Sequence, residues 1–194
     1  MASEKERIVD FLIEASKLKD IDRTGWLMVD VKKPESVAAH IYSVSLMSAI
    51  LGEKLKVDKQ KLLEMVLVHD LCEVYAGDIA TRKDGRMYVL KKGKIEKFKG
   101  DKKYLEERSM KKILNKLPEE LRRKYYKLWR EYEDGKTKES KIAHELDKLD
   151  YSIQAILYKK RANKKIDRFV DTKRFLRTKY LIELQKIIEK RFDG

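Results

Sequence analysis

Residues 58–78 read DKQKLLEMVLVHDLCEVYAGD, and this stretch decides the fold. Its apolar residues recur three and four positions apart, which is typical of the buried face of an α-helix. Asp58 can cap the N-terminus of such a helix, and Gly77 accepts the left-handed backbone conformation of a helix end. We therefore predict one helix that runs from Asp58 through His69 and Asp70 to about Gly77.

Helical periodicity continues on both sides of this stretch, and strand-like alternation is absent. It predicts further helices over residues 8–18, 37–55, 101–117, 118–134 and 138–158, and a last one from Asp171 onward. The chain has 194 residues, which is enough to bury one core and too few for two comfortable ones. The expected fold is all-α, a single bundle of about seven helices spanning residues 1–194.

Basic residues outnumber acidic ones, with 47 Lys and Arg against 33 Asp and Glu, so the formal net charge is +14. Such a charge attracts phosphate-bearing partners and does not distinguish a nucleotide from a nucleic acid. No apolar stretch approaches the roughly 20 residues that cross a membrane, and the charged N-terminus is unlike a signal peptide. The single cysteine, Cys72, is interpreted as a small core residue. We expect a cytoplasmic protein with no membrane partner.

Two histidines and two aspartates occupy apolar helical segments, namely His40, His69, Asp70 and Asp147. A buried carboxylate is costly without a cation or hydrogen bonds, and a metal would remove that cost. Two imidazoles and two carboxylates form a mixed nitrogen and oxygen shell suited to a divalent metal, with open positions for water and an anionic oxygen. These residues predict a metal-dependent hydrolase site, and phosphate esters are the first substrate class to consider.

Two further carboxylates lie close to this set. Glu73 follows His69 by four residues and Asp70 by three, so a helix brings all three to one face. Glu73 is therefore placed to handle the proton of a water molecule. Asp78, just past Gly77, could orient that water, protonate the leaving oxygen or, with Glu73, ligate a second metal. The sequence leaves these roles open.

Residues 78–100 are the least periodic part of the chain and contain several glycines and many lysines. We interpret them as a mobile loop over the site. Arg23 and Trp26 lie in a polar connection, where spacing alone leaves Arg23 evenly balanced between a surface charge and a substrate contact. On the same grounds, Trp26 is evenly balanced between a core anchor and a substrate contact. His144 is interpreted as a partly exposed helix residue and not as a ligand.

Several ordered segments resemble the HD-domain superfamily and, within it, the 5'-deoxynucleotidase family, in the archaeal and eukaryotic branch that contains HD-domain-containing protein 2. They are RTGW at 23–26, PESVAAH at 34–40, HDLCE at 69–73, GDIA at 77–80 and ELDKLD at 145–150. Similarity extends over most of the chain. The resemblance implies a single HD domain over residues 1–194, with a metal-binding core at about residues 36–160.

The resemblance also implies the metal site. The family's ligands match four positions, His40, His69, Asp70 and Asp147. Its catalytic acidic pair matches Glu73 and Asp78, which also remain candidates for a second metal. Cobalt or manganese is the expected ion, with magnesium, zinc, nickel or iron as alternatives.

Substrate contacts and assembly follow from the same resemblance. Arg23 matches the family's phosphate-orienting arginine, and Trp26 matches the tryptophan that crowds the sugar's 2' position. Asp78 and Thr81 complete the expected substrate contacts. A homodimer is the expected assembly.

The predicted function is that of a metal-dependent phosphomonoesterase. We expect a 5'-nucleotidase that removes phosphate from deoxyribonucleoside or ribonucleoside 5'-monophosphates. Two alternatives stay open, a phosphodiesterase on cyclic or oligonucleotides and a basic nucleotide- or nucleic-acid-binding module with a vestigial site. A small nucleotide, rather than nucleic acid, is the expected partner.

Overall fold

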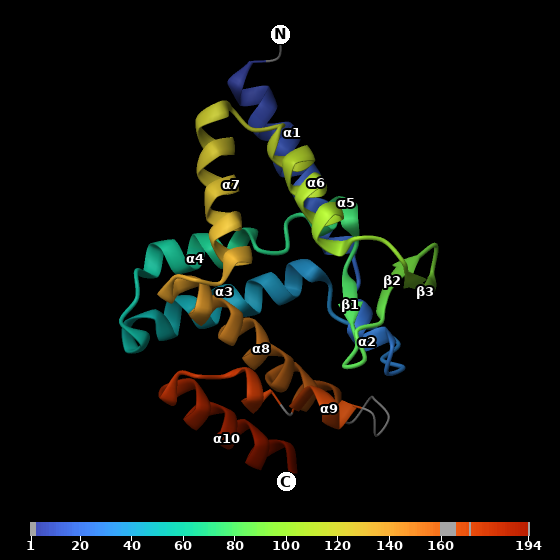
Figure 1. Cartoon of the computed structure of the whole chain (residues 1–194), viewed down its shortest axis with the longest axis vertical. Coiled ribbons are helices and arrows are strands. Elements are labelled where there is room, and N and C mark those ends of the chain that lie inside the picture. The colour runs from blue at the N-terminus through green and yellow to red at the C-terminus, as the bar shows by residue number, and fades with distance from the viewer. Residues whose placement is uncertain (1–2, 160–165, 171, 194) are drawn as a thin grey trace.

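The computed structural model describes residues 3–159, 166–170 and 172–193, and helices dominate it (Figure 1). Within these ranges, seven helices have ten or more residues: α1 (Glu4–Ala15), α3 (Val37–Leu55), α4 (Lys59–Val68), α6 (Lys102–Leu114), α7 (Glu119–Asp134), α8 (Lys138–Tyr158) and α10 (Lys179–Asp193). The shorter elements are α2 (Thr24–Leu27), α5 (Glu73–Ala76), α9 (Asp167–Val170) and the 3₁₀ segments η1 (Ser16–Asp20) and η3 (Lys173–Phe175). The predicted all-α bundle of about seven helices is confirmed. Among the described helices, none combines the length and apolar character that a membrane crossing needs.

Local sequence signals place many of the helix ends. The side chains of Ser36, Asp58 and Asp101 each accept a hydrogen bond from a backbone N–H three residues on, which caps α3, α4 and α6. Gly135 ends α7 with a φ of +60°, a conformation that glycine adopts without strain. The boundaries of these helices therefore follow from residues that the sequence displays.

The helix predicted over residues 58–77 is wrong in one respect, because it breaks after Val68. Residues 69–72 form a turn, and the helix resumes as α5 at Glu73. Adjacent residues of an unbroken helix point about 100° apart, whereas the turn brings His69 and Asp70 side chains within 3.1 Å of each other. The helix expected from Asp171 begins only at Lys179, and Asp171 itself lies outside the described residues.

Residues 78–100 contain a small sheet instead of the predicted mobile loop. Strands β1 (Ile79–Thr81), β2 (Met87–Lys91) and β3 (Lys94–Phe98) pair antiparallel in that order. Lys92 and Gly93 join β2 to β3 with φ values of +47° and +75°, as a tight hairpin requires. Strands of three and five residues, rich in lysine, offer too short an alternation for periodicity to detect.

Helix α8 is the centre of the core, because it packs against α3, α4, α7 and α10 (Figure 1). Leu146 of α8 and Leu62 of α4 are fully buried there, and Cys72 is buried in the same cluster, as the sequence suggested. A second, smaller cluster joins Trp26 to Tyr158 near the C-terminal end of α8. One helix therefore contributes to both apolar clusters, and its middle is held on several sides.

Substitution of Leu62 tests the packing of this core. It is fully buried on α4, whereas Leu67 of the same helix keeps 48% of its surface exposed. Leu62→Ala removes buried apolar surface and leaves a cavity, so we expect the free energy of unfolding to fall by about 2–5 kcal/mol. The matched Leu67→Ala should lower it by less than about 1 kcal/mol. Urea denaturation followed by circular dichroism measures both, and equal losses would contradict the described packing.

Candidate metal centre

His40 lies in the first turns of α3 and is fully buried. Its Nδ1 is 2.7 Å from Asp150 Oδ2 on α8, and because a carboxylate only accepts, Nδ1 donates the hydrogen. Its Nε2 lies 3.1 Å from Asp147 Oδ1 and 3.8 Å from Asp70 Oδ2. Burial and the charge of Arg23 lower the pKa of His40. The carboxylates of Asp147 and Asp150 raise it by a larger amount, so that the resulting pKa is about 9. The position therefore favours a positive charge.

The His69 ring is also oriented by a hydrogen bond at Nδ1, although the acceptor is a backbone carbonyl and not a side chain. Its Nδ1 lies 2.7 Å from the Val66 carbonyl oxygen, which only accepts, so Nδ1 again donates. Its Nε2 lies 3.1 Å from Asp70 Oδ2. The Nε2 atoms of His40 and His69 are both buried, and neither makes a well-directed hydrogen bond although a carboxylate oxygen lies 3.1 Å from each. Because a buried polar atom without a partner is costly, both rings are arranged as if to bind a ligand.

The four residues predicted as ligands come together in space. Potential ligand atoms of His40, His69 and Asp147 all lie within 4.8 Å of one another, and Asp70 Oδ2 faces both imidazoles. They come from α3, from the turn after α4 and from α8 (Figure 1). Two unpartnered imidazole nitrogens and two carboxylates fit a divalent cation. Asp150 and the Val66 carbonyl hold the far side of each ring, as is usual for metal-binding histidines.

Glu73 and Asp78 lie beside this cluster in different environments. Glu73 is 5% exposed, and its Oε2 is buried without a hydrogen-bond partner. Burial, together with the charges of Asp70 and Asp78, raises the pKa of Glu73 well above its usual range. Asp78 Oδ2 instead accepts a 2.6 Å hydrogen bond from the Thr24 amide. Glu73 is thus suited to holding a proton, whereas the Asp78 carboxylate is held in a fixed position by the Thr24 amide.

Arg23 is buried against the cluster, which excludes the interpretation of a surface charge. Only 4% of it is exposed, and its Nη1 donates to Asp70 Oδ2 over 2.9 Å. Its Nη2 donates to the Tyr151 hydroxyl, and the guanidinium carbon is 5.2 Å from the centroid of the Tyr151 ring. The guanidinium plane is therefore set by two partners.

Trp26 and Thr81, the other two predicted substrate contacts, differ in how far they are buried. Trp26 is fully buried, donates from its indole N–H to Glu35 Oε1 over 2.9 Å and packs 4.3 Å from the Phe169 ring, centroid to centroid. It is thus a core residue that also borders the site cavity, and a sugar contact stays a prediction. Thr81 is exposed on β1 at the same cavity. His144 is half-buried, and its Nε2 lies 2.9 Å from the Tyr132 carbonyl oxygen.

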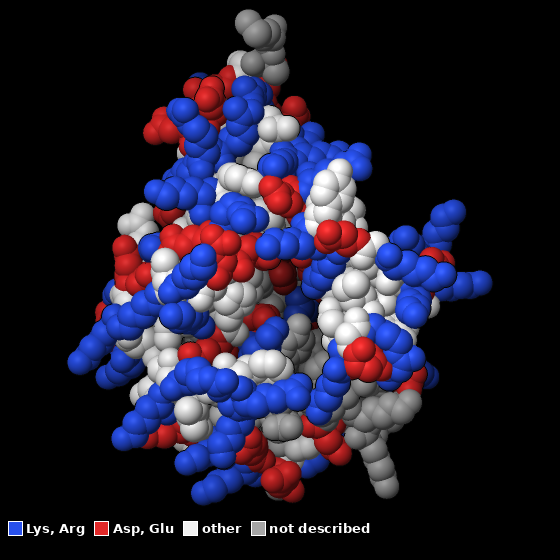
Figure 2. All heavy atoms as spheres, in the orientation of Figure 1, with Lys and Arg blue, Asp and Glu red and all other residues white. Residues whose placement is uncertain are grey.

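These residues surround a cavity of about 780 Å³, which lies in the size range of small-molecule sites. Figure 2 shows the face hollowed near its middle, with acidic and basic side chains at the edge. Several of its lining residues have no role that the sequence predicts: Lys102, Glu106, Glu133, Lys148, Tyr151, Arg174 and Phe175. Tyr151 follows Asp147 by four positions on one helix, so spacing could have found it. Lys102 and Phe175 carry no such signal.

Comparison with known proteins gives the class first. Residues 15–187 match the family described as HD domain, and the chain belongs to that family. A Mus musculus protein named 5'-deoxynucleotidase HDDC2 is 34% identical over 157 residues, which are 81% of this chain and 72% of that protein. The Dictyostelium discoideum protein of the same name is 32% identical over 179 residues, or 86% of this chain and 87% of that one. A conserved hypothetical protein from Pyrococcus furiosus has a solved structure with a TM-score of 0.73 at 29% identity, covering 96% of this chain and 99% of that one.

Asp150 offers a test of the centre that leaves the four candidate ligands in place. We expect Asp150→Asn to weaken cation binding about 10- to 100-fold, because the neutral amide holds the His40 ring less firmly than a carboxylate does. Asp134→Asn, at the exposed end of α7, should leave binding unchanged. Calorimetric titration of Co²⁺ into metal-stripped protein measures both, with circular dichroism to check folding. Equal affinity in the two variants would contradict the role given to Asp150.

Proposed function

We propose that this protein is a metal-dependent phosphohydrolase, a 5'-nucleotidase that removes phosphate from nucleoside 5'-monophosphates. One observation carries the proposal. Asp70 and Asp147 line the cavity beside the buried Arg23 guanidinium, which donates a hydrogen bond to Asp70. The buried Nε2 atoms of His40 and His69 face these two carboxylates. A cation site beside a fixed guanidinium suits an anionic ester. The name that both relatives carry, 5'-deoxynucleotidase, supports a nucleotide as that ester.

A bound cation and Arg23 would contact different oxygens of the phosphoryl group. The residues that would hold a divalent cation are His40, His69, Asp70 and Asp147, and we propose cobalt or manganese because mixed nitrogen and oxygen donors suit such ions. When bound, the ion supplies Lewis acidity to a phosphate oxygen and lowers the pKa of water. Arg23 neutralises charge on the remaining oxygens. Its plane is already set by Asp70 and Tyr151, so little reorganisation is needed as charge develops.

Glu73 and Asp78 take different parts in proton movement. Because the pKa of Glu73 is raised, we assign to it the exchange of a proton with the attacking water or the leaving 5' oxygen. Asp78, held by the Thr24 amide, orients the reacting groups. Ligation of a second metal by Glu73 and Asp78 is the alternative to these roles.

The family resemblance adds three finer parts to the proposal. Trp26 would limit the space near the sugar 2' position, and Thr81 would contact the substrate from β1. The active assembly would be a homodimer.

The direct test is phosphate release by metal-stripped protein after cobalt, manganese or magnesium is restored. We expect metal-dependent release from deoxyribonucleoside or ribonucleoside 5'-monophosphates and none from the matched 3'-monophosphates. Faster release from the deoxy substrates would support the position given to Trp26. Cleavage of cyclic or oligonucleotides in place of monophosphates would identify a diesterase. No release with any metal would contradict the proposal.

Arg23→Ala removes the fixed guanidinium. We expect kcat/KM to fall by about 10²- to 10³-fold, because one preorganised donor to developing charge is typically worth that much. Arg123→Ala on α7, whose side chain is 73% exposed, is the matched control and should leave kcat/KM unchanged. Steady-state phosphate release gives both values. Unchanged turnover in Arg23→Ala would remove this residue from the mechanism.

A further inference from the structure

Residues 172–178, between α9 and α10, form one rim of the cavity and are anchored to α8 at their first residue. Thr172 Oγ1 lies 2.7 Å from Ser152 Oγ of α8 and donates to Gln185 Oε1 of α10 over 2.9 Å. All three side chains are buried. Gln185 in turn donates to the Val170 carbonyl over 2.6 Å. This end of the segment is thus fixed by a buried hydrogen-bond network.

Glu145 of α8 holds the other end. Its Oε2 accepts hydrogen bonds of 2.9 Å from the backbone N–H groups of both Arg177 and Thr178, and its Oε1 accepts one of 3.0 Å from the Thr178 hydroxyl. The Glu145 side chain is buried, and bonds to a carboxylate are stronger than neutral ones. Glu145 and Ser152 lie on either side of Asp147 along α8. Both anchors therefore fix the segment relative to the candidate metal centre.

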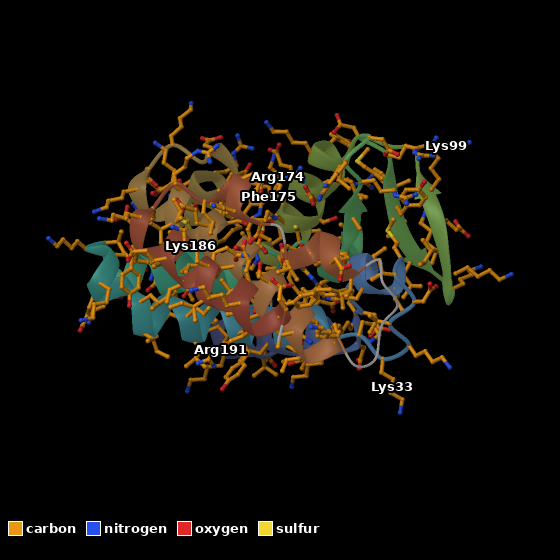
Figure 3. All side chains as sticks on the ribbon, turned by 90° about the horizontal axis from the view of Figure 1, so that it is seen from below. Lys33, Lys99, Arg174, Phe175, Lys186 and Arg191 are labelled. Carbon is orange, nitrogen blue, oxygen red and sulfur yellow. The ribbon has the colours of Figure 1, made fainter. Side chains whose placement is uncertain are left out.

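Between the anchors, η3 presents Arg174 and Phe175 side by side (Figure 3). Phe175 keeps 45% of its surface exposed although the segment is fixed, and both residues line the cavity. The Arg174 guanidinium carbon lies 4.6 Å from the Phe175 ring centroid. An exposed aromatic ring beside a guanidinium is a surface on which a nucleic-acid base can stack.

The cavity therefore has two chemically different parts. Arg23, Asp70 and Asp147 line it with groups suited to a phosphate and a cation. Phe175, on η3, lines the same cavity with a planar apolar surface. A nucleoside 5'-monophosphate has the same division, because its phosphate and its planar base are separated by the sugar.

We propose that Arg174 and Phe175 form the nucleobase subsite, with Phe175 stacking against the base and Arg174 supporting that ring. This inference rests on the proposed function, because it assigns the base of the proposed substrate. Stacking depends on a π-face that every base has, so the subsite predicts activity on purine and pyrimidine nucleotides alike.

The test compares two substrates that differ only in the base, deoxyadenosine 5'-monophosphate and the methyl glycoside of 2-deoxyribose 5-phosphate. Stacking contributes about 1–3 kcal/mol per base, so Phe175→Ala should lower kcat/KM for the nucleotide roughly 5- to 150-fold, chiefly through KM. For the base-free ester kcat/KM should not change. Phe175→Tyr keeps the ring and should behave as wild type. Tyr180→Ala removes an exposed aromatic ring of α10 that does not line the cavity, and should leave both substrates unaffected.

A second measurement is independent of turnover. Deoxyadenosine, which has no phosphate, is titrated into metal-stripped protein by calorimetry, and its Kd should rise in Phe175→Ala by the same factor as KM. Losses that are equal for the nucleotide and the base-free ester, or a Kd that does not change, would overturn the subsite. If the wild type releases phosphate from neither ester, the proposed 5'-nucleotidase function fails. Nucleoside binding then still decides the subsite.

Discussion

The buried hydrogen bond between His40 and Asp150 is the interaction on which the site depends. It joins α3 to α8 across the core and fixes the orientation of the imidazole, with Nδ1 toward Asp150. His40 Nε2 is thereby left facing Asp147 and Asp70. Removing Asp150 would leave His40 Nδ1 buried without its hydrogen-bond partner, so the pair stabilises the fold as well as the site.

Helix α8 connects the separate parts of the cavity. Within two turns it carries Glu145, Asp147, Asp150 and Ser152. The first and last anchor residues 172–178, Asp147 belongs to the candidate metal centre, and Asp150 orients His40. Because one helix positions these groups, a shift of α8 would move the rim and the centre together. The packing of α8 against α3, α4, α7 and α10 resists such a shift.

The bundle could be predicted from sequence because its long helices have amphipathic faces and visible caps such as Ser36 and Asp58. The candidate metal cluster could be located because histidine and aspartate are conspicuous in apolar segments. Local patterns do not show where an element breaks to aim two adjacent side chains, which is why the turn at His69 was missed. They also do not show which remote residue closes a cavity. Lys102 and Phe175 reach the site through tertiary packing, and the strands after Asp78 are too short to give a period.

The central claim is that the four converging side chains hold one divalent cation. Anomalous diffraction at the cobalt edge, on crystals of cobalt-loaded protein, tests it most directly. We expect a single strong peak within bonding distance, roughly 2.0–2.2 Å by analogy with first-row metal sites, of His40 Nε2, His69 Nε2 and carboxylate oxygens of Asp70 and Asp147. A peak bound elsewhere, or no peak between the two imidazoles, would contradict the account.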